Sequence, residues 1–354
     1  MLRHLVSTLV VGASLGVFAN RAHAEDPTPE KPVTLRIATM APEGTPWAKL
    51  MDLYKKKVEE RTGKRVIVKI YLGGKSGGEN ETVTKAVNGQ LQAVAASTGA
   101  VASVVPELLP IEMPFLFAGF KEADYILDEV LTKPMEEHFA KRGLVLGFWS
   151  ENGFRHFGSN SGLIKTPKDL EGKKMRSQES RIHTAMWKAF KSSGNALPTT
   201  EVLTALSAGT VEGFDQGLLF TIAAKWHKAV KFFTLSAHIY QPAVACFNKK
   251  WFDALPPDIQ KALVEEGRAI QATGRKLIRA LNGDLVAMIK KELGDTEAEP
   301  HVYDLTTKDK RGERAAFVAA TRAVRDDFMA DPKVLPTVKA TLKAIEDGLA
   351  AFRK

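Results

Sequence analysis

The sequence predicts an α/β protein of two lobes, with long C-terminal helices that brace them. Three observations predict this class. Strand and helix patterns alternate from Val33 onward, the 354 residues exceed one comfortable core, and the pattern turns almost wholly helical after Pro257. Hydrophobic residues make up 44% of the chain, which is ample for one large or two moderate cores.

The first 24 residues have the order of a secretory signal peptide. A basic head, Met1–His4, precedes an uncharged apolar run from Leu5 to Ala19 and the small-residue triplet Ala22-His23-Ala24. We expect cleavage after Ala24. The alternative is a membrane anchor, but the apolar run is shorter than the roughly 20 residues that span a bilayer. The sequence therefore predicts an exported chain, whose proline-rich residues 25–32 form a flexible linker.

Composition and charge exclude several functional classes. The formal net charge is +9, and the surplus of lysine suits an anionic small ligand, although solvated helix faces explain it equally well. No basic block is interleaved with aromatic residues, so we expect no nucleic-acid partner. Cys246 is the only cysteine, which excludes an intramolecular disulfide and a cysteine-based metal site.

The first structural unit has clear boundaries. Residues 33–38 alternate like a half-buried strand, and Thr45 followed by Pro46 has the pattern of a helix N-terminus. Apolar residues then recur at helical spacing until Thr62-Gly63, and residues 65–72 alternate again. This order predicts a β-α-β unit with parallel strands.

Further alternation extends the pattern along the chain. We expect helices near residues 82–91, 121–141, 180–192 and 200–208, strands near 93–97, 144–149, 155–159 and 244–248, a short strand ending at Arg176, and little regular structure over 106–117. We assign residues 33–152 and 242–283 to the first lobe, and residues 153–241 to the second, with the helices of 284–354 bracing the second lobe.

Catalytic signatures are scarce. There is no H-E-x-x-H motif, and the histidines do not fall at metal-ligand spacing on one helix. Gly74-Lys75-Ser76 resembles the end of a P-loop, but Lys69 stands where its first glycine belongs. Residues 74–78 do satisfy G-x-S-x-G after a predicted strand. An exported serine hydrolase that uses Ser76 is therefore one alternative, and a glycine-rich turn without chemistry is the other.

Two arginines are candidates for binding a ligand, and one of them lies where an α/β sheet binds ligands. Arg176 ends a short predicted strand just before Ser177-Gln178, and Arg155 begins another strand beside aromatic residues. Ligands of open α/β sheets bind at the carboxyl ends of strands. An arginine there can hold a carboxylate through two parallel hydrogen bonds. For Arg155 alone, a salt bridge explains the residue at least as well.

The order and spacing of several blocks resemble a known family. These blocks are Glu107–Phe117, Asp169–Arg176, Asn195–Pro198 and Thr210–Gln216. They resemble the solute-binding subunits of tripartite ATP-independent periplasmic (TRAP) transporters of the DctP type, and the likeness extends over nearly all of the chain beyond the leader.

The resemblance implies a fold and a function. It implies a two-lobed periplasmic binding protein fold with mixed sheets and an interlobe cleft that closes on an organic acid of the dicarboxylate type. The solute would then pass to the small and large membrane permease subunits. We accordingly expect a periplasmic monomer with no enzymatic activity, no cofactor and no metal.

The resemblance also implies site residues. The arginine that grips the solute carboxylate falls on Arg176, and a second, frequent arginine falls on Arg155. Other substrate-binding positions are expected at Gln216, Asp215, Glu43, Asn80, Ser97 and Gln241.

The chain departs from the family just beyond Arg176. Where relatives often carry Pro-Asn, this sequence has Gln178-Glu179. The Glu179 carboxylate could pair with Arg155, repel a second acidic group or accept a hydroxyl group. The sequence leaves these three possibilities open. Trp187 and Phe214 could add apolar walls to the cleft, although core packing is the better interpretation.

Overall fold

A computed structural model describes residues 26–354 of the chain. The predicted signal peptide, residues 1–24, lies outside the described residues, so its cleavage after Ala24 stays a prediction. Residues 26–32, the predicted linker, contain no helix or strand. Within the described part of the chain, none of the helices combines the length and the apolar character needed to cross a membrane.

The first unit forms as predicted. Strand β1 (Val33–Thr39) pairs in parallel with β2 (Val66–Tyr71), and helix α1 (Pro46–Arg61) connects them. The Thr45 hydroxyl oxygen accepts a hydrogen bond of 3.3 Å from the Ala48 N–H, which caps the helix, and Pro46 occupies its first turn. The β-α-β prediction is confirmed.

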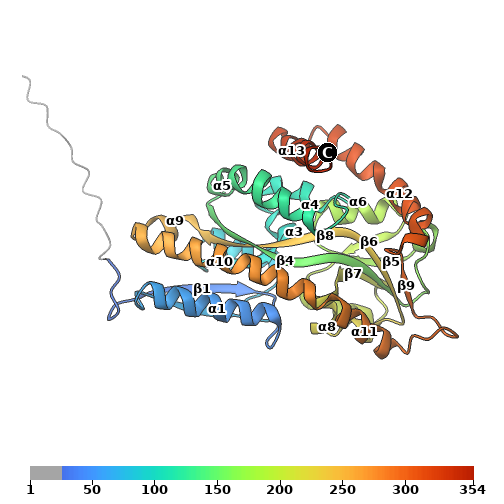
Figure 1. The fold of residues 1–354 in the computed structure, drawn as a ribbon, viewed down its shortest axis with the longest axis horizontal. Coiled ribbons are helices and arrows are strands. Elements are labelled where there is room, and N and C mark those ends of the chain that lie inside the picture. The colour runs from blue at the N-terminus through green and yellow to red at the C-terminus, as the bar shows by residue number, and fades with distance from the viewer. Residues whose placement is uncertain (1–25) are drawn as a thin grey trace, which may run out of the picture.

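The described strands form one mixed sheet. Its order is β2-β1-β3-β8-β4-β7-β5-β6, and β9 pairs with β8. The remaining strands are β3 (Ala93–Ser97), β4 (Leu144–Ser159), β5 (Lys174–Ser177), β6 (Ser193–Ala196), β7 (Gly213–Gly217), β8 (Phe232–Asn248) and β9 (Val302–Asp304). We call β2, β1 and β3 the β1–β3 half, and β7, β5 and β6 the β5–β7 half. The long strands β4 and β8 run across the middle between them (Figure 1).

Strands β4 and β8 correct two expectations. Residues 144–149 and 155–159, predicted as separate strands, belong to the single strand β4, which is bulged between Glu151 and Gly153. Gly153 has φ +89°, a conformation that glycine adopts without strain, and it lies at this bulge. Strand β8 begins at Phe232, twelve residues before the predicted start, and continues through Pro242, which lies opposite Glu151.

Helices flank both halves of the sheet. The shorter ones are α2 (Glu79–Val87), α3 (Thr98–Val101), α4 (Phe120–Tyr125), α5 (Thr132–Lys141), α6 (Arg181–Ala189), α7 (Val202–Ser207), α8 (Leu218–Ala223) and α9 (Lys249–Asp253). A π-helical segment, η2 (Ile126–Leu131), joins α4 to α5, so the predicted helix over 121–141 is continuous. The 3₁₀ segments are η1 (Pro106–Glu112), η3 (Pro167–Leu170), η4 (Thr199–Glu201), η5 (Trp226–Ala229) and η6 (Lys308–Lys310). Segment η1 is more regular than the loop expected there.

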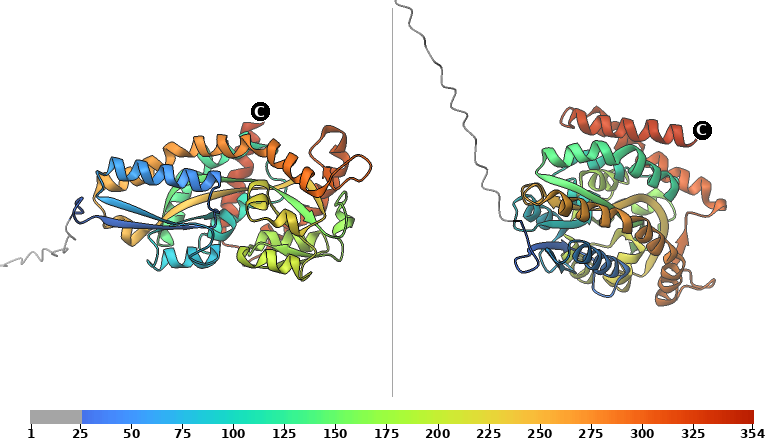
Figure 2. Two further views of the ribbon diagram at one scale, coloured as in Figure 1. Left: turned by 90° about the horizontal axis from the view of Figure 1, so that it is seen from below. Right: turned by 60° about the vertical axis from the view of Figure 1, so that its left-hand side comes forward.

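The C-terminal helices pack on both halves. They are α10 (Pro257–Ala280), α11 (Asn282–Leu293), α12 (Arg311–Ala330) and α13 (Pro336–Phe352). Helix α10 lies beside α1 and covers β4 (Figures 1 and 2). Helix α12 packs against α6, as the predicted bracing of the second lobe requires, but α13 packs against η1 and η2, which belong to the segment assigned to the first lobe. The lobe boundaries themselves stay a prediction.

Candidate functional site

A cavity lies where the two halves of the sheet meet. It encloses about 900 Å³ of empty space, its opening to solvent included. Both halves and the two central strands contribute to its wall. The polar lining residues are Thr39, Glu79, Ser97, Ser150, Asn152, Arg176, Gln178, Thr199, Gln216, Gln241 and Gln271, and the larger apolar ones are Met40, Trp47, Leu50, Met51, Phe148, Trp149, Phe220 and Ile270.

Arg176 carries the only positively charged side chain in this lining among residues 26–354. Strand β5 pairs with β6 and β7 and places the arginine in the β5–β7 half, where it is 1% exposed. Its Nε and Nη2 groups donate to the Leu197 carbonyl oxygen at 3.2 and 2.9 Å, and its guanidinium lies 5.4 Å from the ring centre of Trp226. Its Nη1 group is buried and has no hydrogen-bond partner.

The electrostatic surroundings of Arg176 favour an added negative charge. Burial, and then the positive charge of Arg155, lower the pKa of Arg176 to about 10. The side chain is therefore protonated at neutral pH, and the unpartnered Nη1 is a charged donor held away from water. Because buried charges normally have partners, this end of the cavity has the properties of an anion site.

Arg155 is equally buried but its hydrogen-bonding groups are occupied. Its Nε and Nη2 donate to the Asp215 side-chain Oδ2 and to the Asp215 carbonyl oxygen, both at 2.5 Å. Its Nη1 donates to the side-chain oxygens of Gln241, Gln216 and Gln178 at 2.7, 3.1 and 3.3 Å. Arg155 does not line the cavity. It holds in place three amides that do.

The carboxylate of Asp215 is stabilised in its charged form. Burial alone would raise its pKa, but the charge of Arg155 and the imidazoles of His183 and His238 hold the pKa well below its usual value. The nearest imidazole atom, His238 Nε2, lies 3.3 Å from Asp215 Oδ2. The Arg155–Asp215 pair is therefore a fixed ion pair behind the cavity wall.

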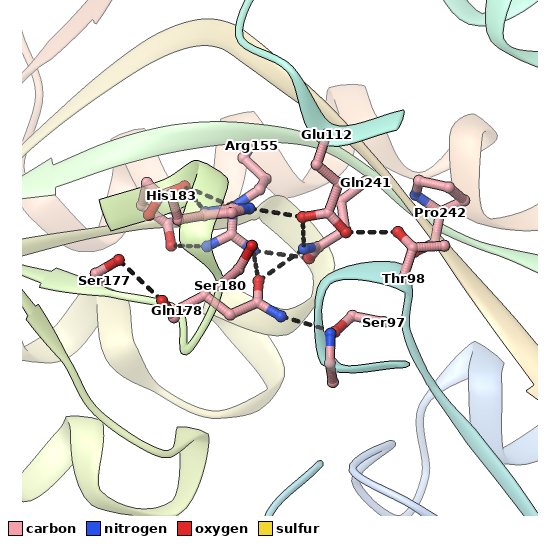
Figure 3. A network of polar contacts seen from close by, with 12 residues as sticks. Ser97, Thr98, Glu112, Arg155, Ser177, Gln178, Ser180, His183, Gln241 and Pro242 are labelled. Carbon is pink, nitrogen blue, oxygen red and sulfur yellow. Dashed lines mark hydrogen bonds and ion pairs between the residues drawn. The ribbon is translucent and has the colours of Figure 1, made fainter. Parts of the chain in front are cut away.

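Glu112 connects this pair to the β1–β3 half. Its carboxylate accepts hydrogen bonds from Thr98 Oγ1 at 2.5 Å and from Gln241 Nε2 at 2.8 Å, and its Oε2 lies 2.6 Å from His183 Nε2 (Figure 3). Gln178 adds a second connection, because its Nε2 donates to Ser97 Oγ at 2.8 Å. A continuous polar network thus joins segments that are far apart in the sequence.

Glu79 is a lining residue that the sequence did not indicate. It begins α2, and its two carboxylate oxygens accept from the Ser97 N–H and hydroxyl group, both at 2.8 Å. Burial raises its pKa, and the hydrogen bonds from Ser97 oppose that shift only in part. The carboxyl group therefore holds a proton more readily than an ordinary glutamate does.

The eight residues predicted for the site occupy three places. Arg176, Gln216, Ser97 and Gln241 line the cavity. Arg155 and Asp215 lie in the network behind it. Glu43 and Asn80 are not among its lining residues: Glu43 is exposed and paired with Lys75 at 2.6 Å, and the Asn80 carbonyl oxygen accepts from Thr84 Oγ1 at 3.0 Å. Whether these residues bind substrate stays a prediction.

The structure also places four other residues that the sequence analysis discussed. Trp187 and Phe214 are fully buried in core clusters and do not line the cavity. In the described part of the chain no hydrogen bond joins Glu179 to Arg155, and Gln178 contacts that arginine instead. Ser76 lies in the turn before α2, where its carbonyl oxygen accepts from Lys85 Nζ at 2.7 Å, and no histidine within residues 26–354 hydrogen-bonds to its hydroxyl group.

Comparisons with known proteins agree with this architecture. Residues 37–330 match the family model described as DctP, bacterial extracellular solute-binding protein, family 7. The chain is 33% identical over 295 residues to a solute-binding protein of Verminephrobacter eiseniae, an alignment that covers 83% of this chain and 84% of the relative. It is 28% identical over 291 residues to the 2,3-diketo-L-gulonate-binding periplasmic protein YiaO of Escherichia coli, over 82% and 84% of the two chains.

A solved structure confirms the predicted fold class. The sugar acid binding protein DctPAm of Advenella mimigardefordensis, solved in complex with galactonate, superposes with a TM-score of 0.80 at 25% identity. The match covers 90% of this chain and 99% of that one. The two-lobed mixed α/β fold is therefore shared with solute-binding proteins.

Proposed function

The chain belongs to family 7 of the bacterial extracellular solute-binding proteins, the DctP family, and we propose that it binds an organic acid through Arg176. The observation that carries this proposal is the buried Nη1 group of Arg176, a charged donor without a partner at the wall of a cavity. A ligand carboxylate would supply the missing negative charge and accept from this group, whereas the other donors of Arg176 keep their bonds to Leu197.

The transport role is inferred from membership of this family. The TRAP-type members of the family are periplasmic solute-binding proteins of transporters, and their fold is not that of an enzyme. We propose that this protein is exported after cleavage at Ala24, acts as a monomer and delivers its ligand to the small and large permease subunits. Ligand contacts from both halves of the sheet would favour the closed form by a population shift.

The serine hydrolase alternative is not supported. The family and the fold are those of binding proteins, and the hydroxyl group of Ser76 has no histidine hydrogen-bonded to it within residues 26–354. A nucleophilic serine needs an adjacent base to activate it. Residues 74–78 are better explained as a glycine-rich turn, in which Gly74 and Gly77 have positive φ angles.

The test is ligand binding by the mature chain and two variants of Arg176. A thermal-shift screen against mono-, di- and keto-acids identifies the ligand, since a ligand at 100 times its dissociation constant adds about 2.7 kcal/mol of stability. Calorimetric titration then compares wild type with Arg176→Ala and Arg176→Lys. We expect both variants to lose measurable binding while their thermal unfolding stays cooperative, because lysine cannot keep the Leu197 bonds and grip a carboxylate together.

Arg181→Lys is a matched control. Arg181 is an exposed arginine at the start of α6 that pairs with Asp331 and does not line the cavity. Its substitution makes the same chemical change without touching the proposed anion site. Wild-type affinity in Arg176→Lys, or loss of binding in Arg181→Lys, would contradict the proposal. Chemical change of the bound acid on recovery would restore the enzyme alternative.

A further inference from the structure

The charges behind the cavity wall are already balanced. Arg155 pairs with Asp215 at 2.5 Å, and His183 lies 2.6 Å from Glu112. Burial lowers the pKa of His183, but the carboxylates of Asp215 and Glu112 outweigh that effect and raise it above its ordinary value. Each positive group of this network therefore has a negative partner, and the network offers no further positive charge to a ligand.

Arg176 consequently supplies the only unpaired positive charge at the cavity. Glu79 is the one acidic residue of the described lining, and in either protonation state it contributes no positive charge. A ligand with one carboxylate neutralises Arg176. A ligand with two carboxylates would leave the second charge without a positive partner in the lining, which is costly in a buried site.

Few hydrogen-bonding groups remain free beside Arg176. Gln241 donates to Glu112 and to Gln178, and Ser97 donates to Glu79. Gln178 donates to Ser97 through one of the two N–H bonds of its amide. Gln216 accepts from Arg155 and from the Gly217 N–H at 2.8 Å, so no hydrogen bond within the described residues uses its NH₂ group. This end of the cavity can therefore hold one carboxylate and a neighbouring oxygen.

Most of the cavity surface is apolar. Met51, Phe148 and Ile270 come from α1, β4 and α10 and belong to one core cluster. The ring of Trp47 lies 6.3 Å from that of Phe220, and both line the cavity.

The aromatic N–H groups of this wall are already bonded. Trp47 donates to the Glu151 carbonyl oxygen at 2.7 Å, and Trp149 donates to Thr132 Oγ1 at 2.8 Å. Partners for a ligand with several hydroxyl groups remain at other lining residues, among them Ser150, Asn152 and Thr199, but most of the cavity surface is hydrocarbon, where an apolar tail would be removed from water.

We propose that the ligand is a monocarboxylic acid whose remaining part is mainly apolar, such as a branched aliphatic acid, and not a dicarboxylate or a polyhydroxylated sugar acid. This inference rests on the proposed carboxylate-binding function. The carboxylate binds Arg176, a polar substituent next to it binds the Gln216 amide, and the hydrocarbon tail packs between α1, β4 and α10.

Three acids test the inference on the mature wild-type chain. Calorimetric titration compares 4-methyl-2-oxopentanoate, succinate and galactonate, which represent an apolar monocarboxylate, a dicarboxylate and a sugar acid. We expect 4-methyl-2-oxopentanoate to bind at least about tenfold more tightly than the other two, since the apolar wall discriminates by roughly tenfold or more for each methylene group.

The outcomes separate this inference from the proposed function. If succinate or galactonate binds as tightly or more tightly, and Arg176→Lys abolishes that binding, the carboxylate function stands and the apolar preference is wrong. If none of a broad panel of acids binds, or if binding is the same in Arg176→Lys, the proposed function itself is wrong and the inference falls with it.

A glycine substitution locates the tail. Gly274 lines the cavity within α10, and a Cβ atom there would lie 3.1 Å from Leu50 Cδ1. Gly274→Ala narrows the apolar end without opposing the helix, because alanine favours helices more than glycine does. We expect about tenfold weaker binding of 4-methyl-2-oxopentanoate and unchanged binding of pyruvate, which lacks the branched tail.

Gly283→Ala is the matched control. Gly283 lies near the start of α11, and a Cβ atom there has nothing within 4 Å. We expect this variant to bind both acids like wild type. Equal effects of Gly274→Ala on the two acids, or no effect on either, would show that the tail does not lie against α10 and would overturn that part of the inference.

Discussion

Arg155 and Arg176 are two arginines with the same burial and opposite surroundings. Each is 1% exposed, and a single strand, β7, separates their strands in the sheet. Arg155 donates to Asp215 and to three glutamine oxygens, so its charge and its donors are occupied. Arg176 is held by one carbonyl oxygen and keeps Nη1 without a partner at the cavity wall.

The difference teaches how a buried charge can serve structure or binding. A buried ion that is paired and hydrogen-bonded fixes the groups around it, and removing one partner strands the other. A buried cation that has a donor without a hydrogen-bond partner can bind an anion instead. Burial alone would not distinguish the two arginines. Their hydrogen-bond partners do.

The largest expected effect comes from removing the satisfied arginine. Arg155→Met leaves the carboxylate of Asp215 buried without its cation, so we expect a loss of about 3–5 kcal/mol in the free energy of unfolding. Urea denaturation of the unliganded protein measures this loss. Arg176→Met is the matched variant. We expect it to change the free energy of unfolding by about 1 kcal/mol or less, because it leaves no buried carboxylate without its paired cation. Similar losses in the two variants would remove the distinction between them.

Mild acid should destabilise the protein through two buried histidines, His238 and His156. Burial lowers the pKa of His238 to about 4, against the pull of Asp215, and burial together with the charges of His238 and Arg314 lowers the pKa of His156 to about 3. The stability that these neutral imidazoles contribute is complete above about pH 6.5 and is lost as the pH falls toward the folded values. We expect these two imidazoles together to lower the free energy of unfolding by about 2 kcal/mol between pH 6.5 and 5.5.

The pH dependence has an internal control. His183 has a raised pKa, so its contribution is complete below pH 6.5 and is lost as the pH rises through its folded value. It therefore adds no loss between pH 6.5 and 5.5. His238→Gln should reduce the acid slope of the unfolding free energy by about half, whatever its own cost at pH 7. An unchanged slope in this variant would show that His238 is not held neutral.

Gln178 both contacts Arg155 and lines the cavity. It accepts from Arg155 Nη1 at 3.3 Å and from Gln241 Nε2 at 2.7 Å, and it donates to Ser97 Oγ across the cavity. Gln178→Leu should therefore lower the free energy of unfolding by about 1 kcal/mol and weaken ligand binding by about fivefold. Urea denaturation and calorimetric titration measure the two effects.

The matched control is a glutamine that serves structure alone. Gln260 of α10 donates to the Leu255 carbonyl oxygen at 2.9 Å and does not line the cavity. Gln260→Leu should cost a similar amount of stability and leave the dissociation constant unchanged. If Gln178→Leu also left the dissociation constant unchanged, the Gln178 amide would stabilise the fold without contributing to ligand binding.

The features that could be predicted from the sequence are those that depend on residues close together in the chain. Arg176 was predicted because it ends a short predicted strand before a polar segment, and it does lie in the short strand β5 and in the cavity lining. The helix boundary at Thr45-Pro46 was likewise local. The continuity of β4 was not predictable, because the bulge near Gly153 has the same local pattern as a turn and only pairing with β8 distinguishes them.

The partners of the buried charges were beyond local pattern as well. Asp215 lies 60 residues from Arg155 in the chain, and Glu112 lies 71 residues from His183. Which arginine is satisfied is decided by these distant contacts. A sequence can therefore indicate both arginines as site residues, but it cannot assign one to binding and the other to structure.

The smallest expected effect tests the two glutamates of the β1–β3 half. Glu43, predicted for the site, is exposed and paired with Lys75, whereas Glu79 lines the cavity and accepts two hydrogen bonds from Ser97. Glu43→Gln should leave the dissociation constant of the ligand unchanged, because an exposed ion pair outside the lining is screened by water. Glu79→Gln makes the same change inside the lining and should lower the dissociation constant of a carboxylate ligand, since it removes the acidic group from the cavity wall. Calorimetric titration of both variants with one acid decides the matter. A changed constant in Glu43→Gln would mean that the loop between β1 and α1 closes over the ligand and that the anion site extends beyond Arg176.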